Sequence, residues 1–301
     1  MRKLYDLLSA DGIDVKKEHP LAPHSSFRVG GNARLAAFPK SLSELICVLR
    51  HARATAVRFS VFGNASNVVF PDGGFDGLVV FTGACRNVEI QDKTIISSCG
   101  ASMTRVASLA CENGLSGAEF MHGIPGTVGG GVYMNAGAFE GCIAQICTQT
   151  TYWNKTTGEI STFEGDAHNF GTRTSVYAQN DDYVLLEARF VLKEDDKTAI
   201  RARMDDFMAR RKSSQPLEYP SAGSVFKRPV GHFAGKLIQD CGLKGYTIGG
   251  AQVSKKHAGF IINIGGATAD DIDRLAEYVK NTVYAQTGVL LEREIQFVKE
   301  S

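Results

Sequence analysis

The chain has 301 residues, 44% of them hydrophobic, and a formal net charge of +1. This length exceeds what a single compact core usually holds, so two or three domains are expected. Lys and Arg are scattered among Asp and Glu without a basic stripe, which argues against a nucleic-acid or membrane-surface partner.

No segment approaches the roughly 18 consecutive apolar residues of a membrane-spanning helix. Residues 4–8 are too short and too polar for the core of a signal peptide. The seven cysteines form no C-x-x-C pair, and no His/Cys grouping has metal-ligand spacing. A cytoplasmic protein with free thiols and no metal site is therefore expected.

The first predicted elements alternate between helix and strand. Ser41 and Glu44 have the spacing of a capping box, and apolar residues at helical intervals then predict a helix over 45–52. Short buried strands are predicted over 57–62 and 77–82.

The middle of the chain is predicted to be rich in β-structure. A helix over 102–113 is closed by Gly114, a residue that readily adopts the left-handed conformation at a helix C-terminus. The segments rich in β-branched and aromatic residues then predict strands over 148–153, 159–163 and 183–193.

The last third is predicted to mix helices and short strands. A helix over 199–212 marks the start of a new domain, and a capped helix begins at Thr268 and carries an apolar stripe along one face. Short strands are predicted around Ser224, Gln252 and Ile261 and over 293–299. The elements together indicate an α+β protein with mixed sheets.

Three familiar motifs are excluded. No G-x-G-x-x-G follows a strand, so a Rossmann dinucleotide site is not supported. Residues 231–237 have one residue too few for a P-loop and lack the Ser/Thr that would bind magnesium. No G-x-S-x-G elbow is present.

Two glycine-rich loops remain as candidate nucleotide-binding loops. Residues 62–67 directly follow a strand and contain small or amide side chains, so several backbone N–H groups can point at one anion. Residues 122–131 combine Pro125 with several glycines and are apolar enough to lie against a planar ring. Taken alone, each loop could equally be a tight turn, because turns share this composition.

The order of the motifs carries a stronger signal than either loop. The motifs are PHSSFRVGG (23–31), GNASN (63–67), GIPGTVGG (123–130), MNAGA (134–138), FGTRTS (170–175), QPLEYPSAGSVFKRP (215–229), GGAQVS (249–254), HAGF (257–260) and LERE (291–294). This array spans nearly the whole chain and resembles the bacterial UDP-N-acetylenolpyruvoylglucosamine reductases. The short length is similar to the compact form of that family, which lacks an inserted loop carrying a substrate tyrosine.

The resemblance implies an FAD-binding fold of the vanillyl-alcohol oxidase type. It consists of two α+β subdomains followed by a C-terminal α+β substrate-binding domain. The expected ranges are 1–82, completed by 289–301, for the first subdomain, 83–198 for the second, and 199–288 for the substrate domain.

The implied reaction reduces the enolpyruvyl ether of UDP-N-acetylglucosamine to UDP-N-acetylmuramate for peptidoglycan synthesis. Non-covalent FAD and the cosubstrate NADPH are the implied cofactors, and the nucleotide sugar is the implied partner of a monomeric protein. Carried over by motif, Ser224 donates the proton, while Arg173 and Glu294 stabilise the enolate-like state at the substrate carboxylate. Glu294 would then have to be protonated, which requires a raised pKa.

The resemblance also implies binding residues. The cofactor-binding residues are Gly63, Asn64, Ala65, Ser66, Asn67, Gly123, Ile124, Pro125, Gly126, Gly129 and Gly130. The substrate-binding residues are Asn135, Gly223, Lys227, Arg228 and His257. One position departs from the family, because Thr172 stands where an aromatic residue usually precedes the catalytic arginine.

Two other functions stay open. The first is an FAD-dependent oxidase of the same fold, which uses dioxygen and often tethers its flavin through His or Cys; His122 is the histidine placed for this. The second is a non-catalytic nucleotide-sugar binder, which needs no flavin.

Overall fold

The computed structural model describes residues 1–299, which form two compact units. The first comprises residues 1–17, 34–64 and 77–210, and the second comprises 18–33, 65–76 and the described residues from 211 onward. The chain therefore passes from one unit to the other several times, once between Asn64 and Ala65 and once near the end of the long helix α6 (Lys197–Ser214). The predicted division at 82 and 198 is finer than these two units and stays a prediction.

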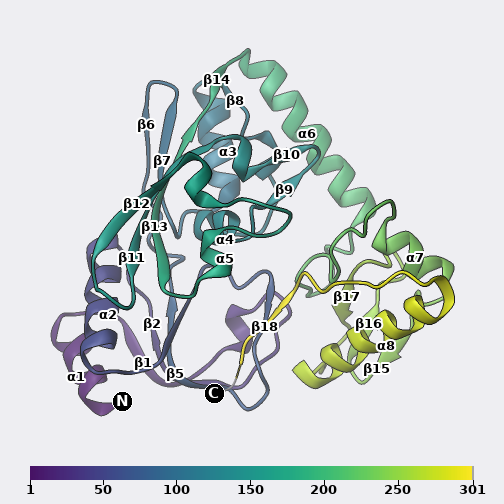
Figure 1. Cartoon of the computed structure of the whole chain (residues 1–301), viewed down its shortest axis with the longest axis horizontal. Coiled ribbons are helices and arrows are strands. Elements are labelled where there is room, and N and C mark those ends of the chain that lie inside the picture. Colours follow the sequence, from purple (N-terminus) through teal and green to yellow (C-terminus); the bar gives the residue numbers. More distant parts are fainter. Residues whose placement is uncertain (300–301) are drawn as a thin grey trace. The chain divides into compact units, whose positions relative to one another are not determined.

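The first unit is built around two sheets (Figure 1). One has the strand order β1-β2-β5-β3, and β3 and β5 run parallel. Its strands are β1 (Val15–Pro20), β2 (Asn32–Ala37), β3 (Phe59–Phe62) and β5 (Phe75–Phe81). The other is antiparallel, with the order β12-β11-β13-β7-β6. Its strands are β6 (Val88–Gln91), β7 (Thr94–Ser98), β11 (Cys147–Asn154), β12 (Ile160–Glu164) and β13 (Tyr183–Val191).

Helices of the first unit pack against one another and against the second sheet. Helix α1 packs on α2, and α3 and α4 pack on β7. The helices are α1 (Arg2–Ala10), α2 (Leu42–Ala54), α3 (Met103–Glu112), α4 (Val128–Tyr133) and α5 (Val176–Gln179), with short 3-10 helices at 119–121, 143–145 and 165–168. A further 3-10 helix at 22–24 belongs to the second unit. The remaining strand pairs are β9 (Gly137–Ala138) with β10 (Gly141–Cys142), and β8 (Leu115–Ser116) with β14 (Lys193–Glu194).

The second unit is smaller. Its antiparallel sheet has the order β15-β16-β17, and α8 packs on this sheet and on α7. The elements are α7 (Ala234–Asp240), β15 (Thr247–Ile248), β16 (Ala251–Val253), β17 (Ile261–Asn263) and α8 (Ala269–Thr287). Near the C-terminus, β18 (Gln296–Phe297) pairs in parallel with β4 (Val68–Val69).

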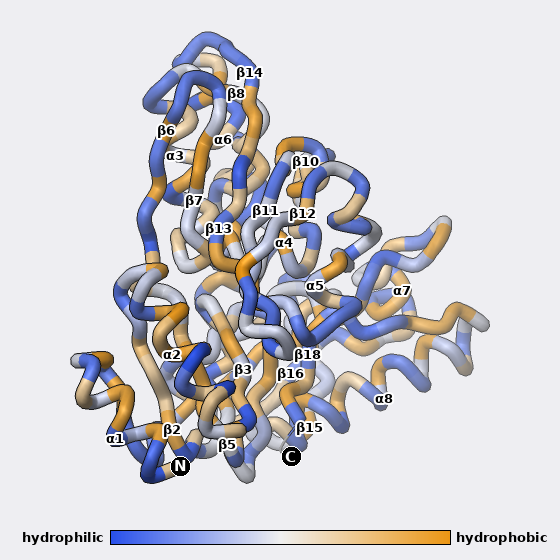
Figure 2. The backbone as a smooth tube through the Cα atoms, turned by 60° about the vertical axis from the view of Figure 1, so that its left-hand side comes forward, coloured by the Kyte–Doolittle hydropathy of each residue, from blue (hydrophilic) through white to orange (hydrophobic). Residues whose placement is uncertain are grey.

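Each unit has its own hydrophobic core. The first contains the fully buried Trp153 and Phe190, and the second contains the buried face of α8. The colours along α8 alternate in Figure 2 because its stripe of Ile272, Leu275, Ala276, Val279 and Val283 is buried while the opposite face is polar. This stripe was predicted from the sequence and is confirmed.

Several predicted boundaries are confirmed by capping interactions. Ser41 and Ser102 accept a hydrogen bond from the backbone N–H three residues later at the starts of α2 and α3. Thr268 and Asp271 form a capping box at the start of α8. Each cap satisfies a helix N–H group that has no partner within the helix. The mixture of these helices with antiparallel and parallel strands confirms the α+β class.

Three predicted elements differ from the structure. The C-terminal strand is confined to Gln296–Phe297, because its partner β4 is only two residues long. Ser224 lies in an isolated bridge instead of a strand. The loop predicted over 122–131 becomes helix α4 from Val128, although three glycines disfavour a helix. Packing explains this difference, because a Cβ atom on Gly131 would lie 2.6 Å from the sulfur of Met103.

Two further sequence predictions concern the thiols and the membrane. All seven cysteines are free thiols, as predicted. Within residues 1–299, every helix is either too short or too polar to cross a bilayer.

Candidate active site

The first predicted phosphate-binding loop begins where β3 ends. In the described part of the chain, the backbone N–H groups of residues 63–67 donate no hydrogen bond to protein. Ala65 has φ +44, which turns the backbone into the left-handed region. A loop of this kind presents several N–H groups that can donate hydrogen bonds to an anion, and its predicted role in binding phosphate stays a prediction.

The two predicted loops lie against each other within the first unit. A Cβ atom on Gly63 would lie only 2.0 Å from Thr127 Oγ1, so no larger residue fits there. Asn64 Nδ2 also donates a hydrogen bond to Pro125 O at 3.1 Å. The fold therefore brings together two glycine-rich segments that are about sixty residues apart in sequence.

The second loop uses its own N–H groups differently. Gly123 N donates to Thr104 Oγ1, and Gly129 N donates to Cys99 O. At the start of α4, Thr127 Oγ1 accepts a hydrogen bond from Gly130 N. Because these donors are satisfied by protein, the loop is suited to offer a close, rigid main-chain surface rather than a cluster of anion-binding amides.

Arg173 lies on a tight turn of the first unit. Gly171 and Thr174 form a bridge on either side of it, and Arg173 itself has φ +56, an uncommon and strained value for a side chain of this size. Its Nη2 atom donates a hydrogen bond to Gly137 O at 3.2 Å. Thr172, the position expected to depart from the family pattern, is exposed on the same turn.

Two side chains anchor this turn to neighbouring segments. Asn135 Nδ2 donates to Gly171 O, and its Oδ1 atom accepts from Ala144 N, both at 2.9 Å. The fully buried Ser175 donates from Oγ to Tyr133 O at 2.8 Å. Asn135, predicted to bind substrate, thus has a structural task that positions the arginine turn.

Three buried side chains of the first unit, Thr150, His168 and Tyr177, form a chain of hydrogen bonds. His168 Nδ1 is 2.9 Å from Gly165 O, His168 Nε2 is 3.0 Å from Thr150 Oγ1, and Thr150 Oγ1 is 2.6 Å from the hydroxyl of Tyr177. Since a carbonyl oxygen only accepts, Nδ1 carries the imidazole proton and Nε2 accepts from Thr150. Burial lowers the pKa of His168 and raises the pKa of Tyr177, so both side chains are neutral at pH 7. No spacing in the sequence indicated this chain, because its members come from three separate segments.

Ser224 and Glu294 belong to the second unit and are joined through their backbones. Glu294 N donates to Val225 O at 2.8 Å, and Ser224 forms an isolated bridge with Phe260. Among residues 1–299 the Ser224 hydroxyl makes no hydrogen bond, which leaves it able to donate to a ligand. Arg173, the third predicted catalytic residue, belongs to the first unit.

The segment around Glu294 is fixed by its neighbours. Arg293 Nη1 and Nη2 pair with Asp273 and Glu277 on α8, at 2.5 and 2.8 Å. Asn67, a predicted flavin-loop residue, donates from Nδ2 to Glu294 O at 3.2 Å. A predicted cofactor residue and a predicted catalytic residue are therefore in direct contact within this unit.

The predicted substrate cations lie close to Ser224 in the chain. Lys227 pairs with Glu292, and the Arg228 guanidinium lies 4.0 Å from the centre of the exposed Phe233 ring. Gly223 has φ +78, which a residue with a side chain rarely adopts. Arg228 is exposed and so is accessible to an anionic ligand, whereas Lys227 is half-buried.

His257 is held in one orientation. Its Nδ1 atom accepts a hydrogen bond from Gly259 N at 3.1 Å, and its ring meets Phe260 edge-on. Burial lowers the pKa of His257, so the imidazole is neutral at pH 7. Because Nδ1 accepts, the proton resides on Nε2, which becomes a hydrogen-bond donor.

Comparison with known proteins finds family matches in both halves of the chain. The family model described as "UDP-N-acetylenolpyruvoylglucosamine reductase, C-terminal domain" matches residues 215–298, and the model described as "FAD binding domain" matches residues 33–164. The UDP-N-acetylenolpyruvoylglucosamine reductase of Caldicellulosiruptor bescii is 45% identical over 97% of this chain and 93% of its own length. The second such reductase of Bacillus cereus is 43% identical over 100% of this chain and 98% of its own length.

Solved structures support the same conclusion about the fold. UDP-N-acetylenolpyruvylglucosamine reductase (MurB) from Thermus caldophilus superposes with a TM-score of 0.80 and 30% identity, covering 95% of this chain and 99% of that one. An alkyldihydroxyacetonephosphate synthase gives a TM-score of 0.50 at 15% identity over 64% of this chain and 41% of that one, a likeness of fold alone. The predicted flavin-binding fold class is confirmed by these matches and by the FAD-binding-domain match.

Proposed function

The chain belongs to the family of UDP-N-acetylenolpyruvoylglucosamine reductases, and on this premise we propose that Ser224, Arg173 and Glu294 carry out its reaction. It is an FAD-dependent oxidoreductase of peptidoglycan precursor synthesis, with NADPH as hydride donor. The substrate is the enolpyruvyl ether of UDP-N-acetylglucosamine, and the product is UDP-N-acetylmuramate. The observation that carries this function is the similarity to named reductases over the full length of the chain.

The residues of the two glycine-rich loops fit a flavin nucleotide. The free N–H groups of residues 63–67 suit a pyrophosphate, and the absence of a side chain at Gly63 lets this loop pack directly against Thr127 of the other loop. Residues 123–126, 129 and 130 supply the second surface. The chemistry supplied by bound FAD is transfer of a hydride from NADPH to the methylene carbon of the enolpyruvyl group.

Arg173 is assigned to the substrate carboxylate. Addition of a hydride to the methylene carbon moves an electron pair onto the neighbouring carbon and its carboxylate, so negative charge grows there. A guanidinium in a fixed position stabilises this charge without having to reorganise during the reaction. The strained, doubly anchored turn that carries Arg173 is the kind of support that such a role requires.

Ser224 is assigned as the proton donor. Its hydroxyl gives a proton to the carbon that bears the ether oxygen, which completes the lactyl group. A serine hydroxyl is a weak acid, so the proton has to be replaced from a neighbouring group or water. Lys227 lies three residues further on, but its ammonium already pairs with Glu292.

Glu294 is assigned to the opposite side of the developing enolate. In its protonated form it donates a hydrogen bond to the charge that forms there. Its backbone is tied to Val225 next to Ser224, and its neighbour Arg293 is anchored on α8. The segment that carries the Glu294 carboxyl group is thus hydrogen-bonded to the segment that carries Ser224.

Substrate contacts are assigned to residues near these groups. Lys227 and Arg228 are the expected partners of the diphosphate, His257 donates from Nε2 to the nucleotide sugar, and Gly223 allows the chain to approach it. Asn135 is retained as a substrate contact in addition to its anchoring role. The protein is further proposed to be a cytoplasmic monomer that acts without nucleic acid or membrane.

The visible spectrum of the freshly purified protein tests this function. A yellow protein should be bleached by NADPH under anaerobic conditions and should recover its colour when the enolpyruvyl sugar is added. Reoxidation only by dioxygen would support the oxidase of the same fold, and a colourless protein that binds UDP-sugars would support the non-catalytic binder. Light scattering on the same sample tests the monomer.

A further inference from the structure

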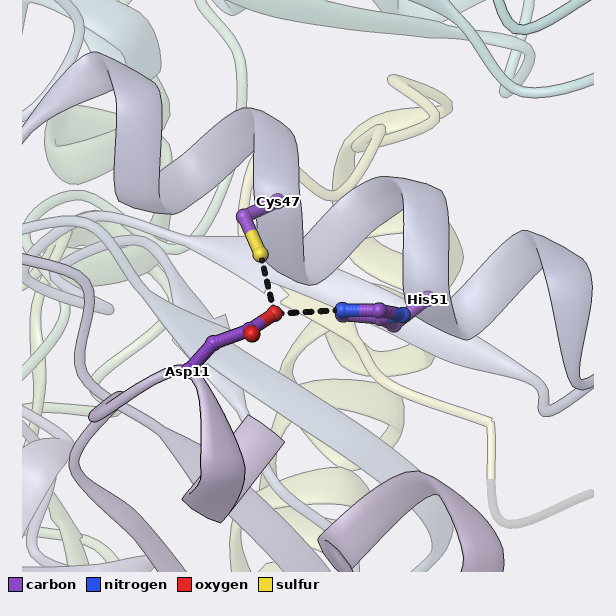
Figure 3. A group of neighbouring side chains, drawn as sticks. All are labelled: Asp11, Cys47 and His51. Carbon is purple, nitrogen blue, oxygen red and sulfur yellow. Dashed lines mark hydrogen bonds and ion pairs between the residues drawn. The ribbon is translucent and has the colours of Figure 1, made fainter. Parts of the chain in front are cut away.

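Three potential metal ligands meet on the surface of the first unit, outside every segment assigned to the reaction. Cys47 and His51 lie one helical turn apart on α2, and Asp11 caps the C-terminus of α1 (Figure 3). Asp11 Oδ2 is 3.1 Å from Cys47 Sγ and 2.6 Å from His51 Nε2. All three donor atoms lie within 4.8 Å of one another.

We propose that Asp11, Cys47 and His51 bind a divalent cation of the zinc class and so link α1 to α2. One sulfur, one nitrogen and one oxygen donor form a set that Zn²⁺ accepts, whereas Mg²⁺ and Ca²⁺ select oxygen donors alone. Neighbouring ligands of a tetrahedral zinc ion lie about 3.3–3.6 Å apart, given the usual bond lengths. The two distances from Asp11 Oδ2, 3.1 and 2.6 Å, are shorter by less than an ångström, so small side-chain rotations suffice to admit the ion.

The two helices that carry these ligands are anchored by buried leucines. Leu4 and Leu8 bury one face of α1, and Leu45 and Leu49 bury one face of α2. The ligands are on the outer edges of these helices, where Asp11 remains exposed and Cys47 and His51 are half-buried. Water can therefore fill the fourth position, and the ion can exchange with solvent.

A bound cation would displace the proton of the Cys47 thiol and balance the two negative charges of Asp11 and the thiolate. Ligand spacing along the chain predicted no metal site, because Asp11 joins Cys47 and His51 only through helix packing.

Zinc titration of the untagged, FAD-loaded protein tests the proposal. After dialysis against a chelator, we expect one Zn²⁺ per chain by calorimetry and elemental analysis, and no binding of Mg²⁺ at the same concentration. Cys47→Ser and His51→Asn should each weaken zinc binding by more than about 100-fold. Cys241→Ser and His232→Asn are matched controls at another half-buried cysteine and an exposed histidine, and should bind zinc normally.

A spectroscopic measurement covers the case in which a variant fails to fold. X-ray absorption at the zinc edge of the wild-type protein should show one sulfur ligand, with nitrogen or oxygen completing the shell. NADPH should bleach the flavin at the same rate in Cys47→Ser and wild type, because the site includes no residue of the flavin loops. Zinc without a sulfur neighbour, no saturable binding, or binding that survives both ligand substitutions would overturn the proposal and leave a hydrogen-bonded helix contact.

Discussion

The two segments that carry the proposed reacting groups are held in different ways. The Arg173 turn is held by the bridge between Gly171 and Thr174 and by two side chains, because Asn135 donates to Gly171 O and Ser175 donates to Tyr133 O. Ser224 is held by main-chain hydrogen bonds of its neighbour Val225 with Gly259 and Glu294. The position of Arg173 therefore depends on the identity of other side chains, whereas the position of Ser224 depends on the path of the backbone.

The largest effect is expected from removing the proton donor. Ser224→Ala leaves the backbone contacts intact, so NADPH should still bleach the flavin. Reoxidation by the enolpyruvyl sugar should slow by about 10²–10⁴-fold because the general acid is lost. Stopped-flow absorbance measures the two half-reactions separately. Ser221→Ala is the nearby control, and equal rates in Ser224→Ala and wild type would mean that the proton comes from elsewhere.

A smaller effect is expected from loosening the arginine turn. Asn135→Ala leaves Gly171 O and Ala144 N without their partner, which should cost about 1–3 kcal/mol of unfolding free energy. Displacement of Arg173 should lower the rate of reoxidation by up to about 10²-fold, because the misplacement of a catalytic group is costly. Urea unfolding and stopped-flow absorbance provide the two readouts. A loss of stability without any loss of rate would contradict the positioning role.

The pH dependence of the unfolding free energy should distinguish the buried His168 and the partly buried His257 from exposed histidines. Burial places the pKa of His168 below its unfolded value of 6.5, and His257 shifts in the same direction. The folded state then binds fewer protons, so the stabilisation is complete above about pH 6.5 and is lost as the pH falls below that value. His168→Asn should flatten this part of the urea-midpoint profile, whereas His232→Asn should leave the slope unchanged.

The smallest effect on stability is expected at Lys227, a half-buried cation whose ion-pair partner is exposed. The partner of Lys227, Glu292, is 73% exposed, so Lys227→Ala should change the unfolding free energy by no more than about 1 kcal/mol. If Lys227 contacts the diphosphate, KM for the nucleotide sugar should rise while kcat changes little. Lys236→Ala, which removes a comparable surface pair, is the control. Equal KM values in the two variants would remove Lys227 from the substrate site.

Much of the fold could be predicted because local signals agreed with the final structure. The serine caps of α2 and α3 and the apolar stripe of α8 depend on neighbours within one or two turns, so their residues alone indicated them. Helix α4 could not be predicted in this way. Its glycines disfavour a helix locally, and only the packing of Gly131 against Met103 explains the choice.

The sequence by itself identified the family, and its short contiguous motifs predicted the flavin loops and the residues assigned to the reaction. Only the tertiary structure decided which residues from distant segments meet. Thr150, His168 and Tyr177 become one hydrogen-bonded chain, and Asp11 meets Cys47 and His51, because packing of helices and strands brings distant segments within hydrogen-bond distance. The physical reason is that capping and loop chemistry act over a few residues, whereas burial acts through space without regard to sequence separation.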